Sequence, residues 1–452
     1  MAERVRTARL YKDPFRLGLL VLIVISLSKF GSYFGLLRMI RPALLLFGFC
    51  VAYALLHPKK LILINFRQSV TVRLLVAITL VAVCSAAFGI SLGRAALFFI
   101  DNFSKTIAIT FLMIATLRNL DDLRKLTWAV TFAGILLAFL SIFVVGISKV
   151  ATGVSYDAND VGVFMVMTLP LAILFVQCAA NNFERLTAFV GIGLIAATLV
   201  KTQSRGAFIG ALVVFVVLLL VPGVSAARRM LFVAAVAVTM LVTAPAGYWT
   251  SVQGILSDPK ADYNWGAVDG RRQIAKRGIQ YMRMYPLFGV GINNFALAEG
   301  TISEKARNLI PGHGIRWAAP HNSFVQAGAE TGVIGLLIWV SLLITNVTIP
   351  IRLARRMPRD WRKGTPDQRF LSFAALYIPV AQVGFAVPAL FVSFAWLEPL
   401  YFLSALVVGL TLIVRRVLGP RTSGIGPESR SRRTLSSPNP ALPLPAHSNR
   451  TA

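Results

Sequence analysis

The chain has 452 residues, of which 56% are hydrophobic and 14% are charged, and its mean hydropathy is +0.70. Because about a quarter of the residues of a soluble domain are charged, this composition excludes a soluble protein and predicts that most apolar side chains face lipid. The formal net charge of +28 would favour nucleic acid as the partner of a soluble chain. Here the basic residues fall in short clusters between apolar runs, as membrane topology requires, so we expect membrane lipids and no nucleic acid as partners.

Apolar stretches along the whole chain are predicted to cross a hydrocarbon layer about 30 Å thick as helices that rise about 1.5 Å per residue. They cover residues 15–30, 39–56, 71–90, 95–116, 126–148, 160–177, 186–201, 206–222, 230–248, 322–350, 370–391 and 396–414. The basic N-terminal segment leads into the first stretch without a small-residue cleavage site, so we expect this helix to remain as an anchor. The predicted fold is an all-α polytopic membrane protein of about twelve transmembrane helices.

Clusters of Lys and Arg on alternate loops predict the orientation of these helices, because short loops retain basic residues on the cytoplasmic side. The clusters are Arg4 to Arg16, Lys59 to Arg73, Arg118 to Lys125, Arg228 with Arg229, Arg352 to Arg369, and Arg415 with Arg416. Both termini are therefore expected in the cytoplasm. The predicted domains are helices one to nine in 1–248, a periplasmic loop in 249–321, helices ten to twelve in 322–416, and a disordered cytoplasmic tail in 417–452 that is rich in Pro, Ser and Arg.

The cysteines give no sign of a redox or metal site. Cys50, Cys84 and Cys178 lie in or beside apolar runs and lack the close spacing of zinc ligands. The sequence also has no HExxH metal motif and no Gly-rich phosphate loop of the Walker type. We therefore expect no disulfide, no metal and no cofactor.

Polar residues suited to chemistry fall on loops that the topology places together on the extracytoplasmic side. They are Asn159 and Asp160 before the sixth predicted helix, Lys201, Gln203, Ser204 and Arg205 in the next outer hairpin, Arg271 and Arg272 in the large loop, and His321 and Asn322 at its end. Placing polar groups beside a bilayer costs free energy, so such groups are candidates for a functional role. We predict that these residues share one site.

Each candidate also has a structural interpretation. That interpretation is weakest for Arg205, which lies in a Ser-Arg-Gly turn on the side where short loops avoid positive charge. Gly206 beside it permits the close approach of a ligand or of backbone. The structural alternatives are snorkelling for Lys201 and Arg205, helix capping for Asn159 and Asp160, ordinary loop charge for Arg271 and Arg272, and capping or interfacial packing for His321.

Three motifs occur in order between about residues 150 and 340. They are an SRG hairpin at 204–206, the turn PLFGVGINNF at 286–295 with Arg271 upstream of it, and HNSF at 321–324. In this combination the chain resembles the O-antigen ligase and polymerase family of bacterial envelope glycosyltransferases, and Arg205, Arg271 and His321 fall on the family's landmarks. The resemblance implies a GT-C-like fold with a large periplasmic loop between helices nine and ten.

The resemblance further implies a metal-independent, inverting transfer of a glycan from undecaprenyl diphosphate to an acceptor hydroxyl at the periplasmic face of the bacterial inner membrane. Arginine forks bind phosphate oxygens, so Arg205 and Arg271 would stabilise the departing diphosphate. His321 would act as the general base toward the acceptor hydroxyl. The residues expected to bind substrate are Lys201, Gln203, Ser204, Arg272, Asn322, Asn159 and Asp160.

Alternatives to this function stay open. The acceptor is expected to be lipid A-core oligosaccharide, as for an O-antigen ligase, but the motifs also fit a polymerase of the same family that uses another glycan acceptor. A flippase or transporter would need charges along a path through the membrane centre, which the sequence lacks. Near the first outer loop, Lys29, Arg38 and Arg41 either add charge for the carrier phosphates or anchor the interface, and the i, i+4 pair of Asp101 and Lys105 is expected to be structural.

The predicted topology can be tested with fusions to a reporter that is active only in the periplasm. A fusion near residue 300 should be active, and fusions at residues 360 and 430 should be inactive, because the basic loop from Arg352 to Arg369 is retained in the cytoplasm. Activity of the fusion at residue 360 would overturn the orientation and separate the residues of the predicted site.

Overall fold

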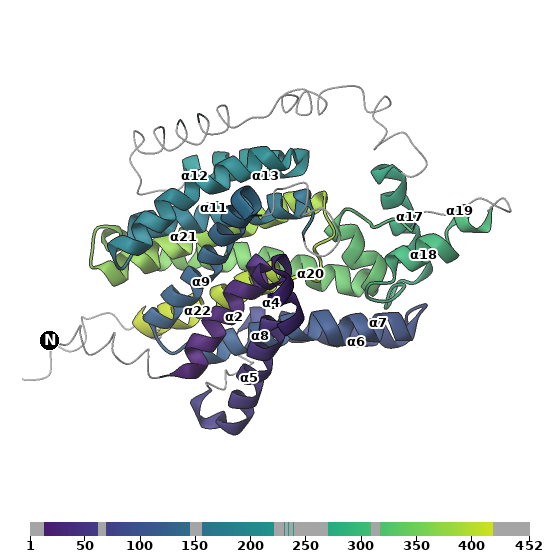
Figure 1. Ribbon diagram of the computed structural model, residues 1–452, viewed down its shortest axis with the longest axis horizontal. Coiled ribbons are helices and arrows are strands. Elements are labelled where there is room, and N and C mark those ends of the chain that lie inside the picture. The colour runs from purple at the N-terminus through teal and green to yellow at the C-terminus, as the bar shows by residue number, and fades with distance from the viewer. Residues whose placement is uncertain are drawn as a thin grey trace, which may run out of the picture.

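The computed structural model describes residues 13–61, 69–144, 156–220, 230, 234, 238, 270–308 and 317–418 (Figure 1). Over these ranges the secondary structure is helical and contains no strand. The α-helices are α2 (Pro14–Ser28), α3 (Phe30–Tyr33), α4 (Gly35–Ile40), α5 (Pro42–Leu56), α6 (Val70–Phe88), α7 (Leu92–Phe98), α8 (Ser104–Thr116), α9 (Leu120–Phe139), α11 (Ala158–Cys178), α12 (Asn182–Thr202), α13 (Arg205–Leu220), α17 (Arg271–Met284), α18 (Phe295–Thr301), α19 (Glu304–Arg307), α20 (Ser323–Arg356), α21 (Pro366–Ala386) and α22 (Glu398–Leu418).

Length and hydropathy identify the membrane spans among these helices. In the described part of the chain, 9 helical stretches are long and apolar enough to cross a membrane, and Pro14–Ser28 and Arg205–Leu220 are shorter apolar helices. The predicted span at 230–248 lies outside the described residues, apart from residues 230, 234 and 238. The prediction of an all-α, multi-pass membrane protein is therefore confirmed, and the number of twelve spans stays a prediction.

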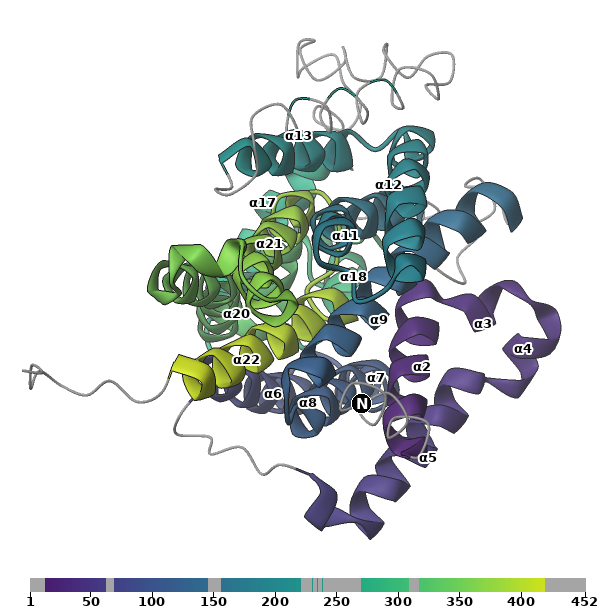
Figure 2. The same cartoon turned by 90° about the vertical axis from the view of Figure 1, so that its left-hand side faces the viewer.

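The helices form a bundle with α11 at its centre. Helix α11 packs against α9, α12, α13 and α21, and α20 packs against α6, α21 and α22. Seen along the bundle, α12 and α13 cover one side, and α2 to α5 form a separate flank beside α9 (Figure 2). Nearly all of α11 is buried, so this helix contacts protein on every side, whereas α5 leaves most of its surface exposed for lipid.

Basic residues from loops far apart in the sequence meet at one end of the bundle. Arg16 donates a hydrogen bond to Asp122 at 2.7 Å, which joins the start of α2 to the start of α9. The guanidinium of Arg416, at the end of α22, donates to the carbonyl oxygen of Arg118. These contacts bring the starts of α2 and α9 and the end of α22 together at one end of the bundle, which we call the Arg-rich end.

The interior of the bundle is held by uncharged polar contacts as well as apolar ones. Asn346 of α20 donates from Nδ2 to Gln382 Oε1 of α21 at 3.1 Å and to Ser404 Oγ of α22 at 2.8 Å. All three side chains are buried. Hydrogen bonds of this kind hold transmembrane helices together because lipid offers no competing partner.

Helices α17, α18 and α19 lie together at the end of the bundle opposite the Arg-rich end (right-hand side of Figure 1). Arg277 of α17 and Glu299 of α18 form a buried ion pair, with Nη2 2.6 Å from Oε2, and Tyr281 donates to the same carboxylate at 2.7 Å. Burial raises the pKa of the Tyr281 hydroxyl. This network joins α17 to α18, and both belong to the segment predicted as the large loop.

Candidate functional site

The first turn of α20 determines the position of His321. Asn322 caps the helix, because its Oδ1 accepts hydrogen bonds from the backbone N–H of Phe324 at 2.9 Å and of Val325 at 3.0 Å. His321 precedes the cap, is half-buried, and has a positive φ of 44°. Its backbone N–H donates to Ser393 Oγ at 3.0 Å. The helix cap is therefore Asn322 rather than His321.

Residues 387–397, which we call the connecting segment, join α21 to α22 and lie against the start of α20. Ser323 donates to the carbonyl oxygen of Val392 and accepts from the N–H of Phe394, both at 2.8 Å. Gln326 Oε1 accepts from the N–H of Ala395 at 3.1 Å. Because the segment is largely non-helical and partly buried, its backbone groups need such partners, and α20 supplies them.

The start of α13 reaches the same segment from the other side. Gly206 packs so closely against Phe391 that a Cβ on this glycine would lie 2.7 Å from Phe391 Cβ. The sequence predicted a close approach at Gly206, and the structure shows that a side chain of the connecting segment makes it. Arg205 begins α13 and is half-buried. Gly206, the neighbour of Arg205, and His321 thus contact residues only two positions apart, Phe391 and Ser393.

The other residues of the α12–α13 hairpin have different surroundings. Ser204 is buried, and its Oγ accepts a hydrogen bond from the N–H of Ala207 at 3.2 Å, which fixes the first turn of α13. Lys201, in the last turn of α12, is exposed, and Gln203 is exposed with a positive φ of 51°. The exposed side chains of Lys201 and Gln203 are accessible to a ligand, whereas the hydroxyl of Ser204 is engaged with backbone.

Helix α11 begins beside this hairpin. Asp157 and Asp160 form a capping box, in which each carboxylate accepts a hydrogen bond from the other residue's N–H, at 2.8 and 3.0 Å. The capping interpretation of Asp160 is thereby confirmed, and its role in binding substrate stays a prediction. Asn159 lies half-buried in the same turn. A Cβ on Gly162 would lie 2.6 Å from Ala207 Cβ, so this turn packs directly on the start of α13.

Helix α17 brings Arg271 to the same end of the bundle. Gly278 packs against Val325, where a Cβ would lie 2.3 Å from Cγ1, and Gly328 packs against Met282, where a Cβ would lie 2.5 Å from Sδ. From the first contact to the second, the residue number rises in both helices. Helices α17 and α20 therefore run parallel, and their N-termini lie at the same end. Arg271, half-buried, begins α17 just as His321 precedes α20, and Arg272 beside it is exposed.

The PLFGVG turn positions α17 by hydrogen bonding to a kink in α20. Gly332 has a φ of 73° inside α20, which interrupts the helix. The carbonyl oxygens of Ala329 and Glu330 accept from the N–H groups of Val290 at 2.8 Å and Gly291 at 3.1 Å. Gly289 and Gly291 of the turn also have positive φ values, 68° and 103°. Glycine adopts such values without strain, so these glycines serve backbone geometry.

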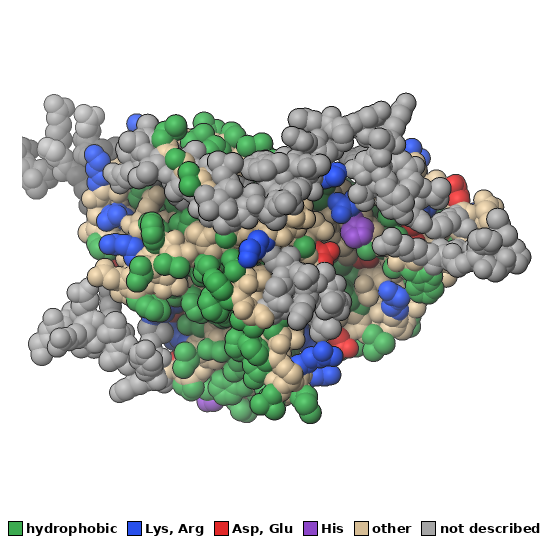
Figure 3. Space-filling model, turned by 45° about the horizontal axis from the view of Figure 1, so that its top comes forward, with side chains coloured by type: hydrophobic (Ala, Val, Ile, Leu, Met, Phe, Trp, Pro, Cys, Tyr) green, Lys and Arg blue, Asp and Glu red, His purple; other side chains and the backbone are tan. Residues whose placement is uncertain are grey.

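The starts of α11, α13, α17 and α20 thus lie at one end of the bundle, opposite the Arg-rich end. Helix N-termini carry partial positive charge and bind anions, and arginine side chains add full charges there. On the face drawn in Figure 3, a histidine side chain lies next to Lys or Arg side chains. This end of the bundle is chemically suited to an anion with several oxygen atoms.

Comparison with known proteins identifies this region. A family model described as O-antigen ligase matches residues 190–340. Over these residues the chain is similar to the O-antigen ligase family. No curated protein matches the chain. The matched residues include the α12–α13 hairpin, α17 and the first half of α20, so Arg205, Arg271 and His321 all lie within them.

The connecting segment lies outside the matched residues, and no motif in the sequence pointed to a function for it. The predicted spans 370–391 and 396–414 left only a short loop between them. The one available signal is the composition of FVSFAWLE at 391–398, where Ser and Glu stand among aromatic residues. Ser393 Oγ accepts a hydrogen bond from the N–H of His321, which directly precedes the cap of α20. Trp396 Nε1 donates to Glu330 Oε2 of α20 at 2.6 Å.

The contribution of the connecting segment can be measured through Ser323. Ser323→Ala leaves one buried carbonyl oxygen and one buried N–H without their partner, so we expect the free energy of unfolding to fall by about 1–3 kcal/mol. The measurement is denaturation by SDS of the purified protein in mixed micelles. Thr348→Ala is the control, because that hydroxyl bonds only to Ile344 of its own helix at an exposed position. Equal stability of the two variants would show that the segment is held by other contacts.

Proposed function

We propose that the protein is an O-antigen ligase, which transfers a glycan from undecaprenyl diphosphate to a hydroxyl of lipid A-core oligosaccharide at the periplasmic face of the inner membrane. The observation that supports this most directly is that Arg205, Arg271 and His321 begin or precede three helices that start at the same end of the bundle. All three residues lie within the stretch that matches the O-antigen ligase family model.

The proposed reaction is a direct displacement. The acceptor oxygen attacks the anomeric carbon from the face opposite the diphosphate, the new carbon–oxygen bond forms, and the bond to the diphosphate breaks with inversion. The electron pair leaves with undecaprenyl diphosphate, and the acceptor proton passes to His321. Diphosphate is already a good leaving group, so the main demand on the protein is fixed positive charge where negative charge develops.

Arg205 and Arg271 supply that charge in this proposal. A guanidinium stays protonated at any physiological pH and donates two parallel hydrogen bonds to phosphate oxygens. Both arginines occupy the first turn of a helix, so the partial positive charge of the helix N-terminus acts on the same anion. The connecting segment and the α17–α20 contact fix these turns, so little reorganisation accompanies the reaction.

His321 serves as the general base. Its backbone is fixed by the hydrogen bond to Ser393 and by the cap at Asn322, and in this proposal its imidazole takes the proton of the acceptor hydroxyl. The Oδ1 of Asn322 already accepts two backbone hydrogen bonds, so its amide nitrogen is the part available to a sugar. Arg272 and Lys201, both exposed, extend the basic surface toward the glycan.

A polymerase of the same family would use this site with a different acceptor. The two functions differ in their effect in cells: loss of a ligase removes long-chain lipopolysaccharide while polymer accumulates on the lipid carrier, whereas loss of a polymerase leaves single repeat units. A transporter is disfavoured by the interior of the bundle, where α20, α21 and α22 meet through the uncharged Asn346, Gln382 and Ser404.

The electrostatic role of the arginines predicts a specific substitution pattern. Arg205→Ala and Arg271→Ala should each lower kcat by about 10² to 10³, as loss of one preorganised donor does, with little change in the amount of folded protein. Arg205→Lys and Arg271→Lys should recover little activity, because lysine lacks the two-pronged geometry. Transfer is measured in vitro with purified protein, lipid-linked donor and acceptor. Arg283→Ala, at the exposed far end of α17, is the control. Wild-type turnover in both alanine variants would refute the proposed clamp.

The role of His321 predicts a loss of turnover without a loss of donor binding. His321→Ala should lower kcat by about 10² to 10⁴, the usual contribution of a general base. The control is His57→Ala, an exposed histidine at the end of α5. Activity of the wild-type protein should persist in EDTA. Near-normal turnover of His321→Ala, or loss of wild-type activity in EDTA, would show that the mechanism is different.

A further inference from the structure

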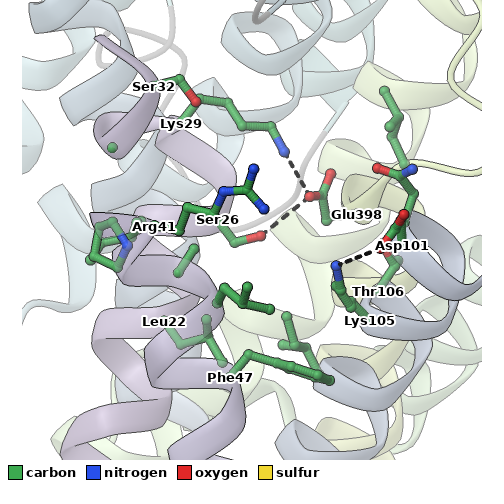
Figure 4. A pocket seen from close by; sticks show the side chains of 18 of the residues that line it. Leu22, Ser26, Lys29, Ser32, Arg41, Phe47, Asp101, Lys105, Thr106 and Glu398 are labelled. Carbon is green, nitrogen blue, oxygen red and sulfur yellow. Dashed lines mark hydrogen bonds and ion pairs between the residues drawn. The ribbon is translucent and has the colours of Figure 1, made fainter. Parts of the chain in front are cut away.

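A cavity of about 470 Å³ lies beside the candidate site, on the flank formed by α2 to α5 (Figure 4). Its walls come from the end of α2, from α4 and the start of α5, from the helical turns around Asp101 and Lys105, and from the residues that begin α22. No residue of the proposed reaction lines it, since Arg205, Arg271 and His321 are absent from its walls.

Basic side chains outnumber acidic ones in this cavity. The basic residues are Lys29, Arg38, Arg41 and Lys105, and the acidic residues are Asp101 and Glu398. Each acid has one lysine as its partner: Lys29 Nζ lies 2.8 Å from Glu398 Oε1, and Lys105 Nζ lies 3.5 Å from Asp101 Oδ1. Two arginines remain without a compensating acid.

Arg38 and Arg41 therefore carry the excess charge of the cavity. Within the described residues, neither guanidinium forms a hydrogen bond or an ion pair, and both side chains are exposed. Arg41 directs its side chain into the space between Lys29 and Lys105 in Figure 4. Arginine forks that converge on one space suit the oxygen atoms of a phosphate group.

Apolar side chains complete the walls of the cavity. Leu22, Leu44 and Phe47 line it on the α2 and α5 side, and Ile109 lines it on the α8 side. A small inorganic anion would leave these side chains without a contact, whereas an alkyl chain attached to a phosphate would bury them. The outer surface of α5 is highly exposed and apolar, so the cavity adjoins a surface suited to lipid.

The ion pair between Lys29 and Glu398 lines the cavity next to the connecting segment. Glu398 begins α22 directly after the connecting segment that holds His321, and Ser26 also donates to its Oε1 at 3.2 Å. The Lys29 ammonium lies 5.1 Å from the centre of the Tyr156 ring, at the start of α11. The cavity is thus a separate space that adjoins the framework of the site.

We propose that this cavity is a second anion site, which binds the phosphate head group of an anionic lipid with Arg38 and Arg41 and its alkyl chain with Leu22, Leu44 and Phe47. Lys29 and Lys105 keep the two acids neutralised, so that the phosphate meets net positive charge. The proposal is independent of the glycan transfer, because it concerns binding alone and none of its residues belongs to the proposed clamp or base.

Binding of dodecyl phosphate to the purified full-length protein, measured by native mass spectrometry, tests this proposal. The wild-type protein should bind one equivalent in preference to dodecyl maltoside, and the double variant Arg38→Gln/Arg41→Gln should bind it at least about tenfold more weakly, because charge-assisted hydrogen bonds are lost. The variant should melt at the wild-type temperature, since both side chains are exposed.

The matched control is Arg352→Gln/Arg355→Gln, two exposed arginines with the same spacing in the last turns of α20. This control should bind dodecyl phosphate as tightly as the wild-type protein. Equal binding by Arg38→Gln/Arg41→Gln and the wild-type protein, or an equal loss in the control, would overturn the proposed site. Inorganic phosphate should compete at least about tenfold more weakly than dodecyl phosphate, because it buries no alkyl chain. Equal competition by the two would overturn the assignment to a lipid.

Discussion

The candidate site depends on a row of side chains along α20 that satisfies the backbone of the connecting segment. Ser323, Gln326 and Glu330 are spaced three and four residues apart, so they lie on one face of the helix. They bind Val392 and Phe394, then Ala395, then the indole of Trp396, in the order of the sequence. Inside a membrane protein, non-helical backbone is stable only when protein groups satisfy it. This row therefore allows an irregular segment to lie beside four helix starts.

Glu330 connects this arrangement to the large loop. Its carboxylate accepts from Trp396, while its backbone carbonyl accepts from Ser85 at 2.6 Å and from Gly291 at 3.1 Å. The carbonyl is available to Gly291 because the kink at Gly332 interrupts the helical hydrogen bonds. One residue of α20 thus contacts the connecting segment, the end of α6 and the PLFGVG turn. A displacement of any of these elements would change the position of Arg271 relative to His321.

Hydropathy was sufficient to predict an all-α, multi-pass membrane protein, and it located the starts of two helices of the candidate site. The predicted starts at 322 and 206 lie within one residue of α20 and α13, because cap and turn residues stand directly before the apolar runs. The part of the site that could be predicted likewise depends on short sequence motifs, such as the turn around Arg205. The connecting segment could not be predicted, because its hydrogen-bond partners, such as Ser323 and Gln326, are distant in sequence. Only the packing of the folded chain brings them together. Asp160 shows that a polar residue beside a membrane can have a structural role, here in a capping box with Asp157.

The two basic regions at this end of the bundle differ in how their arginines are supported, and that difference separates their proposed roles. A group that stabilises a developing charge must stay in place during the reaction, which requires a rigid support. The helix starts at Arg205 and Arg271 have such support, because they pack on the connecting segment and on α20. Arg38 and Arg41 lie on the exposed flank of α4 and α5, where a flexible cation suits a lipid that exchanges with the bilayer. The Lys29–Glu398 ion pair lies between the two regions and keeps the acid that begins α22 neutralised on the side that faces the cavity.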